Sequence, residues 1–319
     1  MNWNALLPEL ILSLGILFVF MLDLLLPKRE YRLLLYLSTL VPIASLTSLL
    51  FVSYPAKAFY DLFEVNSLNL LGKAVIYLLT SLALFSMQDY YEKKNSPYTE
   101  LSYIPLLATL GLSLLISSSN LVLLFVSLEL ASISMYVMVS LMREEYLSKE
   151  SGFKYLVIGA VGTSMLALGS AFYYASTGSF FFKKYTDENS LFLLAMFLFL
   201  SAFALKASAV PYHFWTPDAY EGAPTPITGY LSSVPKVAIY FLLAQLIGYF
   251  YHLKQWLLLV SIISLLSMFY ANFVAYAQRS VKRLLAYSTI AHSGYFFLGL
   301  STFDPQLQKA LLFYVSLYA

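Results

Sequence analysis

The chain has 319 residues, of which 60% are hydrophobic and 11% are charged, and its mean hydropathy is +0.74. This composition exceeds what one globular core can bury, so it excludes an ordinary soluble domain and indicates a polytopic protein of the lipid bilayer. The net charge of +2 is too small to indicate nucleic-acid binding. Without cysteine the chain holds no cysteine-ligated iron–sulfur cluster or haem, so any redox chemistry is expected on other polypeptides.

Long apolar segments follow one another along the whole chain. They span 5–26, 31–54, 66–88, 101–118, 120–142, 152–176, 190–220, 224–251, 255–278, 281–301 and 306–319. Each complete one meets or approaches the roughly 20 residues that a helix needs to cross a bilayer, and none alternates as barrel strands do. The pattern predicts an all-α bundle with about ten spans and part of another. The last segment is too short to cross, so we expect the sequence to be unfinished or completed by another polypeptide.

The distribution of basic residues predicts the orientation. The loops after odd-numbered spans carry Lys28, Arg29, Arg32, Lys93, Lys94, Arg143, Lys149, Lys154, Arg279, Lys282 and Arg283. The loops after even-numbered spans carry Lys57, Lys183, Lys184, Lys254 and Lys309. Because basic loops stay in the cytoplasm, the N-terminus is predicted outside. The first segment lacks a basic region before it and a cleavage site after it, so we interpret it as a retained helix.

The seventh segment is the least regular. It is apolar as far as Lys206, then meets Pro211 and Pro217 and becomes aromatic and polar. Proline removes a backbone donor, so the helix is predicted to break near Lys206 and to resume toward Tyr220. Pro235, directly before Lys236, predicts a second helix irregularity. Broken helices at membrane depth are typical of ion sites in transporters.

Three charged residues lie alone in the middle of apolar segments, namely Glu129, Lys206 and Lys236. A lone charge at this depth costs several kcal/mol and marks a functional site by default. The alternative for the lysines is snorkelling to a headgroup, but Lys236 lies about twelve residues, or roughly 18 Å, into its segment. The alternative for Glu129 is a protonated acid that only joins helices. Two amines and a carboxylate therefore predict transport.

Two histidines are weaker candidates. His292 lies about ten residues into its segment and suits either a proton relay or a neutral packing role. His213 lies in the aromatic stretch PYHFW, which favours a structural hydrogen bond. Four other charged residues are expected to lie at interfaces or to cap helices: Asp23, Lys73, Asp218 and Glu221.

A spacing repeats between two parts of the chain. Glu129 follows the polar turn at Asn120 by nine residues, and His292 follows Arg283 by nine. If the two parts are equivalent, the odd offset of five spans inverts their topology, as in many transporters.

Three stretches resemble the antiporter-like membrane subunits of respiratory complex I, the NADH:quinone oxidoreductase. They are KASAVPYHFWTPDAYEGAPTPITGYLSSVPK from Lys206 to Lys236, LLFVSLELASISMY around Glu129, and VKRLLAYSTIAHSGY around His292. HFWTPDAYEGAPTP is most similar to the subunit N branch, and the similarity covers essentially the whole chain. The resemblance implies three N-terminal helices in 1–100, a first inverted five-helix repeat in 101–251, and the start of a second repeat in 255–319. The second broken helix and its lysine would lie beyond this sequence.

The resemblance also implies roles for the charged residues. Glu129 would pair with Lys206, and Lys236 would pass protons through water and His292 toward the second repeat. A carboxylate favours a charged lysine and burial favours a neutral one, so moving the pair would capture or release a proton. Further polar side chains are candidates to support this route, namely His213, Ser132, Ser134, Ser208, Ser232, Ser233 and Tyr295.

The predicted function is that of a proton-translocating membrane subunit of a bacterial NADH:quinone oxidoreductase, without a cofactor of its own. FMN, iron–sulfur clusters and quinone are expected on partner subunits, and the partners are other membrane-arm subunits, including further antiporter-like ones. The expected location is the bacterial inner membrane, with a periplasmic N-terminus. Two alternatives stay open: a subunit of a multisubunit sodium/proton antiporter, and a structural or assembly subunit.

Overall fold

Helices make up most of the computed structural model, which describes residues 3–27, 31–94, 98–184, 189–250, 253–302 and 305–319. The first part contains η1 (Trp3–Leu6), α1 (Leu7–Leu25), α2 (Tyr31–Ser48), η3 (Leu49–Phe51), β1 (Ala56–Ala58), β2 (Phe63–Val65) and α3 (Ser67–Lys94). The middle contains η4 (Thr99–Ser102), α4 (Ile104–Ile116), α5 (Leu121–Val139), α6 (Tyr146–Thr177), α7 (Ser190–Ala207) and α8 (Trp215–Gly222). The last part contains α9 (Thr225–Phe250), α10 (Lys254–Tyr276), α11 (Val281–Leu300) and α12 (Pro305–Tyr318).

Nine helices among the described residues are long and apolar enough to cross a membrane: α1 to α7, α9 and α10, some extended by a 3-10 turn. The predicted polytopic helix bundle is thus confirmed, and the chain is a multi-pass membrane protein. The predicted spans 281–301 and 306–319 are helical as α11 and α12 but are not among the nine. Helix α12 has 14 residues, too few to cross. Lys28 and Arg29 of the orientation argument lie outside the described residues.

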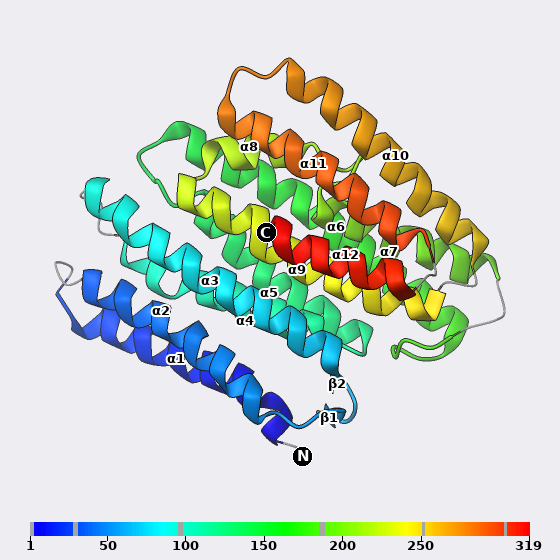
Figure 1. The fold of residues 1–319 in the computed structure, drawn as a ribbon, viewed down its shortest axis with the longest axis horizontal. Helices are drawn as coiled ribbons and strands as arrows, with labels where there is room; N and C mark the ends of the chain where they lie inside the picture. The colour runs from blue at the N-terminus through cyan, green and yellow to red at the C-terminus, as the bar shows by residue number, and fades with distance from the viewer. Residues whose placement is uncertain (1–2, 28–30, 95–97, 185–188, 251–252, 303–304) are drawn as a thin grey trace.

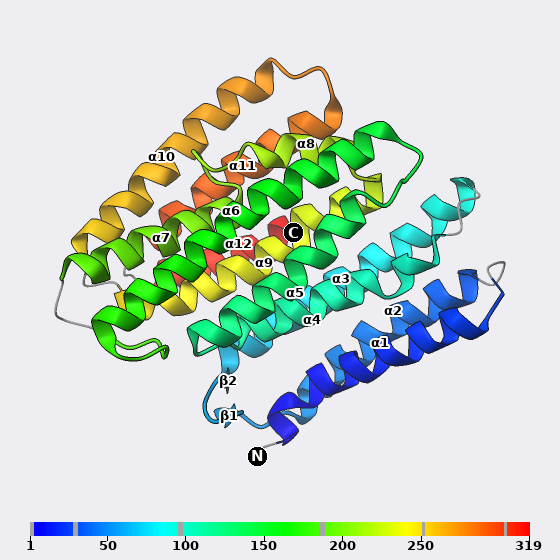
Figure 2. The same ribbon diagram turned by 180° about the vertical axis from the view of Figure 1, so that it is seen from behind.

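Helix α9 lies at the centre of the bundle (Figures 1 and 2). It packs against α3, α4, α5, α7, α8, α11 and α12. Within its most apolar stretch 78% is buried, against 28% for α10, which lies at one edge of the bundle. Helices α1 and α2 lie at the opposite edge (Figure 1). Residues on α9 are therefore the farthest from lipid, and Lys236 is one of them.

Local sequence signals set the helix ends. The side chain of Asn120 accepts from the Val122 amide and begins α5, and that of Asn189 accepts from the Phe192 amide and begins α7. Gly178 ends α6 in the left-handed conformation, at φ 69°. The predicted break after Lys206 is confirmed, because α7 ends there and the chain resumes as α8.

Pro235 lies inside α9, which continues through it as a helix. Proline cannot donate to the carbonyl four residues earlier, which is that of Leu231. The Tyr220 hydroxyl donates to this carbonyl instead, at 3.2 Å. A neighbouring side chain thus satisfies the freed backbone group and keeps the helix intact.

A small hairpin adds a feature that the helical pattern did not predict. Strands β1 and β2 pair antiparallel, with Ala56 opposite Val65 and Ala58 opposite Phe63. The hairpin lies near the N-terminus, at one end of the bundle (Figure 1). Its buried residues Ala56, Ala58, Phe63 and Val65 pack with Ala5, Leu6 and Val52 in a separate apolar cluster.

Candidate functional site

The candidate site is built around the end of α7. Ser208 adopts the left-handed conformation at φ 65°, which costs a residue with a side chain about 1–3 kcal/mol. The Ser208 amide donates to Leu205 O at 3.1 Å and the Ala209 amide to Ala204 O at 2.8 Å, the pair of bonds that defines a Schellman motif. A serine in place of the usual glycine brings a hydroxyl group to the helix break.

Every one of the last four carbonyl groups of α7 has a partner, although a helix end leaves them without intrahelical donors. Ala204 O accepts from the Ala209 amide, Leu205 O from Trp215 Nε1 (2.9 Å), Lys206 O from Lys236 Nζ (3.3 Å) and Ala207 O from Ser293 Oγ (2.6 Å). The donors come from α8, α9 and α11 as well as from the chain itself. The break is therefore a junction of four helices.

Lys206 lies in the last turn of α7 and reaches α5. Its Nζ donates to Ser132 Oγ at 2.9 Å and to the Tyr136 hydroxyl at 3.2 Å, and lies 5.6 Å from the centre of the Tyr136 ring. Gly159 of α6 leaves room for that tyrosine, because a methyl group there would collide with its hydroxyl. Neutral hydroxyl groups and an aromatic face thus hold this amine.

Lys236 approaches the same break from α9 and is 1% exposed. Its Nζ donates to Ser208 Oγ and to Lys206 O, and lies 5.2 Å from the centre of the Trp215 ring. A helix C-terminus carries partial negative charge, which stabilises a cation beside it. No carboxylate forms an ion pair with either lysine in the described part of the chain.

Both lysines line one small cavity. About 20 Å³ of it is open to the centre of a water molecule, which is room for about one water. The other lining residues are Leu112, Leu115, Leu128, Ala131, Ser132, Met135, Tyr155, Trp215, Leu231, Pro235 and Ile239. Mostly apolar walls around two amines exclude bulk water while leaving a place where one water can join them.

The structure does not place Glu129 in contact with Lys206. Glu129 lies on α5, one and two turns before the hydroxyl groups that bind the amine, and its Oε1 is buried without a hydrogen-bond partner. The residues at i+3 and i+7 share a helix face with it. Among the described residues, the hydrogen bonds of the Lys206 amine go to Ser132 and Tyr136, and the pairing with Glu129 stays a prediction.

His292 contacts α12. Its Nδ1 and the Tyr314 hydroxyl are 2.5 Å apart, and its ring lies 4.3 Å from that of Tyr318. Tyr295 touches the ring of His292 but is 44% exposed. No described hydrogen bond joins His292 to Lys236, so the relay step between them is not formed by direct contact.

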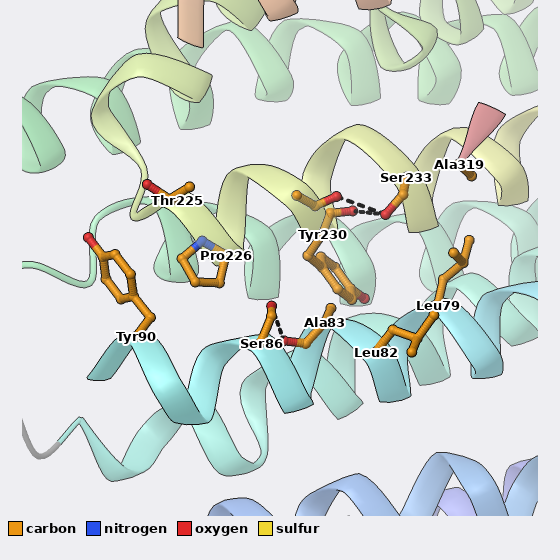
Figure 3. Close-up of a pocket in the computed structure, with 11 residues that line it drawn as sticks. Leu79, Leu82, Ala83, Ser86, Tyr90, Thr225, Pro226, Tyr230, Ser233 and Ala319 are labelled. Carbon is orange, nitrogen blue, oxygen red and sulfur yellow. Dashed lines mark hydrogen bonds between the residues drawn. The ribbon is translucent and has the colours of Figure 1, made fainter. Parts of the chain in front are cut away.

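The other predicted supporting residues lie apart from the two amines, except Ser132 and Ser208. His213 is buried, and its ring packs against Tyr270 and Tyr287. Ser134, Ser232 and Ser233 donate to carbonyl groups of their own helices. Ser233 lines a larger cavity of about 550 Å³ between α3 and α9 (Figure 3), and not the lysine cavity.

The acidic residues of α8 join a charged network at one end of the bundle. Asp218 accepts from Lys154 at 3.1 Å and from Arg283 at 2.8 Å, and Glu221 accepts from Arg283 at 3.0 Å. Lys282 donates to Ala223 O at 2.7 Å. These contacts tie α8 to α6 and α11, which is a larger role than the predicted capping.

Sequence reasoning missed a fully buried ion pair. Lys73 Nζ lies 2.7 Å from Glu9 Oε1, and the two side chains are 1% and 5% exposed. Lys73 was expected near the membrane interface; it is buried inside the protein, with Glu9 as its partner. Glu9 lies two positions after the start of α1 and Lys73 six positions after the start of α3, so sequence spacing alone gave no reason to join them.

Comparisons with known proteins place this architecture among membrane subunits of large complexes. Residues 118–319 match the family described as "NADH:quinone oxidoreductase/Mrp antiporter, TM". NADH-quinone oxidoreductase subunit N 1 of Aquifex aeolicus is 57% identical over 320 residues, covering 100% of this chain and 69% of that protein.

Solved structures share the fold. A chain of respiratory complex I from Thermus thermophilus, solved with bound aureothin, matches with a TM-score of 0.82 and 29% identity over 98% of this chain and 67% of that one. A chain of the Mrp complex from Dietzia sp. matches with a TM-score of 0.83 and 20% identity, over 99% and 62%. This chain thus spans about two thirds of the length of the proteins it matches.

Proposed function

The chain belongs to the NADH:quinone oxidoreductase/Mrp antiporter family and to its subunit N branch, and on that premise we propose that it translocates protons within an NADH:quinone oxidoreductase. One observation supports this most strongly: Lys206 and Lys236 line the same small cavity at a helix break, and no carboxylate of the described residues forms an ion pair with either. Buried amines of this kind are rare in membranes and mark proton or ion pathways.

The partners of the amines suit either protonation state. A hydroxyl group accepts a hydrogen bond from an ammonium and, after rotation, donates one to a neutral amine. Ser132 and Tyr136 serve Lys206 in this way, and Ser208 serves Lys236. Loss or gain of a proton therefore leaves no buried group without a partner.

Transfer between the amines needs one intermediate. The cavity has room for about one water, which would accept a proton from one lysine and give one to the other. Glu129, one turn from Ser132, would bias Lys206 toward its charged form through space. The onward step to His292 would require another water or a side-chain movement.

The rest of the assignment follows from the family. The subunit would assemble with other membrane-arm subunits, including further antiporter-like ones, in the bacterial inner membrane with its N-terminus in the periplasm. FMN, iron–sulfur clusters and quinone would belong to the partners. The subunit's own task would be to couple its two lysines to movements driven by electron transfer elsewhere.

The decisive experiment is Lys236→Ala in the intact complex, reconstituted into vesicles, with protons pumped per NADH oxidised as the readout. We expect this ratio to fall, while Lys254→Ala, which removes an exposed lysine at the start of α10, leaves it unchanged. An unchanged ratio in Lys236→Ala would overturn the proposal. Failure of the chain to co-purify with flavin and iron–sulfur subunits would instead favour the sodium/proton antiporter.

A further inference from the structure

A second carboxylate and amine meet in the three N-terminal helices, away from the break of α7. Glu9 belongs to α1 and Lys73 to α3, and the Ser113 hydroxyl of α4 donates to Glu9 Oε1 at 2.5 Å. The Tyr77 hydroxyl lies 2.7 Å from Ser113 Oγ. Since the single hydroxyl proton of Ser113 is donated to Glu9, Tyr77 is the donor to Ser113. These four residues form one buried polar cluster, in which Tyr77 is the third titratable group.

We propose that the Glu9–Lys73 pair is a second proton-exchanging site of this chain, connected to the central helix α9 by a row of hydroxyl groups between α3 and α4. The proposal rests on the proposed function, because a second site matters only in a subunit that moves protons. It extends that function to the N-terminal helices, which carry no part of the lysine cavity.

The row of hydroxyl groups leads inward from the pair. One turn beyond Tyr77 and Ser113, Thr80 Oγ1 and Thr109 Oγ1 are 2.9 Å apart. Thr109 Oγ1 is in turn 2.9 Å from the hydroxyl of Tyr230 on α9. The two hydroxyl pairs are one helical turn, about 5 Å, apart, so a proton crosses between them only when a water enters the packed space between α3 and α4. Tyr230 also lines the cavity of about 550 Å³ between α3 and α9 (Figure 3).

An apolar cluster packs beside the pair on the side of the hairpin. The ring of Phe63, on the second strand of the hairpin, lies 4.5 Å from Lys73 Nζ and is fully buried. It belongs to the apolar cluster that also contains Ala5, Leu6 and Val65. This cluster covers one side of the pair, and the hydroxyl row is a polar connection from the pair into the protein.

The pair has unused capacity to exchange a proton. Glu9 Oε2 is buried without a hydrogen-bond partner, and Lys73 Nζ has no hydrogen bond in addition to the ion pair. A group needed only for stability would not leave such atoms bare, since a bare buried polar group is costly. Stability alone also does not require the ion pair, because an apolar pair of similar volume is often as stable as a buried ion pair.

The transfer conserves protons along the row. When the Ser113 proton moves to Glu9 Oε1, Ser113 takes the Tyr77 proton, and Tyr77 takes one from an entering water that is resupplied through Thr80, Thr109 and Tyr230. The Thr80 and Thr109 hydroxyl groups first rotate away from the Ile76 and Pro105 carbonyls to which they donate. Tyr230 is reprotonated from a protonated water in the cavity between α3 and α9, so one proton enters at Tyr230 and one arrives at Glu9. Only O–H bonds break and form, and release follows the same steps in reverse.

The test uses Thr109→Val, which removes one hydroxyl from the row and leaves the ion pair untouched, in the intact complex in vesicles. We expect a loss of protons pumped per NADH, with assembly unchanged and a similar loss in Glu9→Gln. The control is Thr39→Val, which removes an exposed threonine hydroxyl bonded within its own helix. If the Glu9→Gln complex does not assemble, the pumping ratio of Thr109→Val still tests the proposal, because this variant keeps the ion pair.

Lys236→Ala, run in parallel, separates this proposal from the proposed function. If Lys236→Ala lowers the number of protons pumped per NADH but Thr109→Val pumps like the wild type, the Glu9–Lys73 pair only joins α1 to α3. The proposal of a second proton-exchanging site is then refuted. If neither variant loses pumping, the proposed function fails first, and the second site fails with it.

Discussion

The two buried lysine sites of this protein stabilise an amine away from water in different ways. Lys73 is held by a carboxylate, Glu9, at 2.7 Å. Lys206 and Lys236 are held by hydroxyl groups, aromatic rings and the carbonyl end of α7. The first arrangement pairs an amine with a carboxylate, whereas in the second no described carboxylate forms an ion pair with either amine.

The difference matters when a group is removed or changes its charge. Deleting one member of an ion pair strands the other as a buried charge. Deleting an amine that is held by neutral groups strands no charge. The N-terminal pair should therefore be sensitive to single substitutions, and the break should tolerate neutral lysine, as a transfer site must.

The largest expected effect is that of Lys73→Ala. It leaves the Glu9 carboxylate buried without a counterion, which destabilises a protein by about 3–5 kcal/mol. We expect the subunit to be lost from the complex on heating, as measured by its retention on native gels. The double variant Glu9→Leu/Lys73→Met should be much closer to the wild type. Equal losses in both would contradict the difference between the two sites.

Lys236→Met should be milder, although Lys236 is as buried as Lys73. It removes charged hydrogen bonds to Ser208 and to a backbone carbonyl, a loss of about 1.5–3 kcal/mol, and strands no charge. Thermal unfolding of the purified complex compares it with Lys73→Ala. A larger destabilisation from Lys236→Met would show that the break depends on its charge for stability.

Gly159→Ala tests the neutral partners of Lys206 without changing any charge. The added methyl group collides with the Tyr136 hydroxyl, and overpacking of this kind costs about 1–3 kcal/mol. We expect lower thermal stability and less pumping. Gly248→Ala is the matched control, since nothing lies within 4 Å of its added methyl and alanine favours helix. The interpretation fails if both variants behave alike.

Arg283→Gln should have the smallest effect. Its ion pairs with Asp218 and Glu221 are partly exposed, and such pairs contribute about 0.2–1 kcal/mol each. The thermal shift should shrink as salt is added, because salt screens exposed charges. Arg279→Gln, at an exposed position nearby, is the comparison. An effect independent of salt would show that packing of the side chain matters more than its charge.

Sequence predicted the break of α7 because its signals are local: an apolar run, a lysine and Pro211 follow one another. It could not predict how the broken end is satisfied, since the donors Trp215, Lys236 and Ser293 come from three other helices. For the same reason, the sequence could not show that the Tyr220 hydroxyl of α8 donates to the carbonyl that Pro235 leaves without a backbone donor.

The Glu9–Lys73 pair lay outside prediction for a related reason. Each residue by itself fits an interfacial position near a helix end. The pair becomes buried because α1, α3 and α4 meet there and because the hairpin places Phe63 over it. Likewise, the family resemblance implied that Glu129 pairs with Lys206, but not that Ser132 and Tyr136 accept the hydrogen bonds of the amine.

The junction at the end of α7 has a thermodynamic consequence. Lys236 binds the carbonyl of Lys206, and Ser293 of α11 binds the next carbonyl along the chain. If a shift of α11 changes how strongly Lys236 holds its proton, then protonation of Lys236 must bias the position of α11 by an equal free energy. A shift of α11 would then change the protonation of Lys236, and a change in the protonation of Lys236 would shift α11. The junction thus allows coupling in both directions.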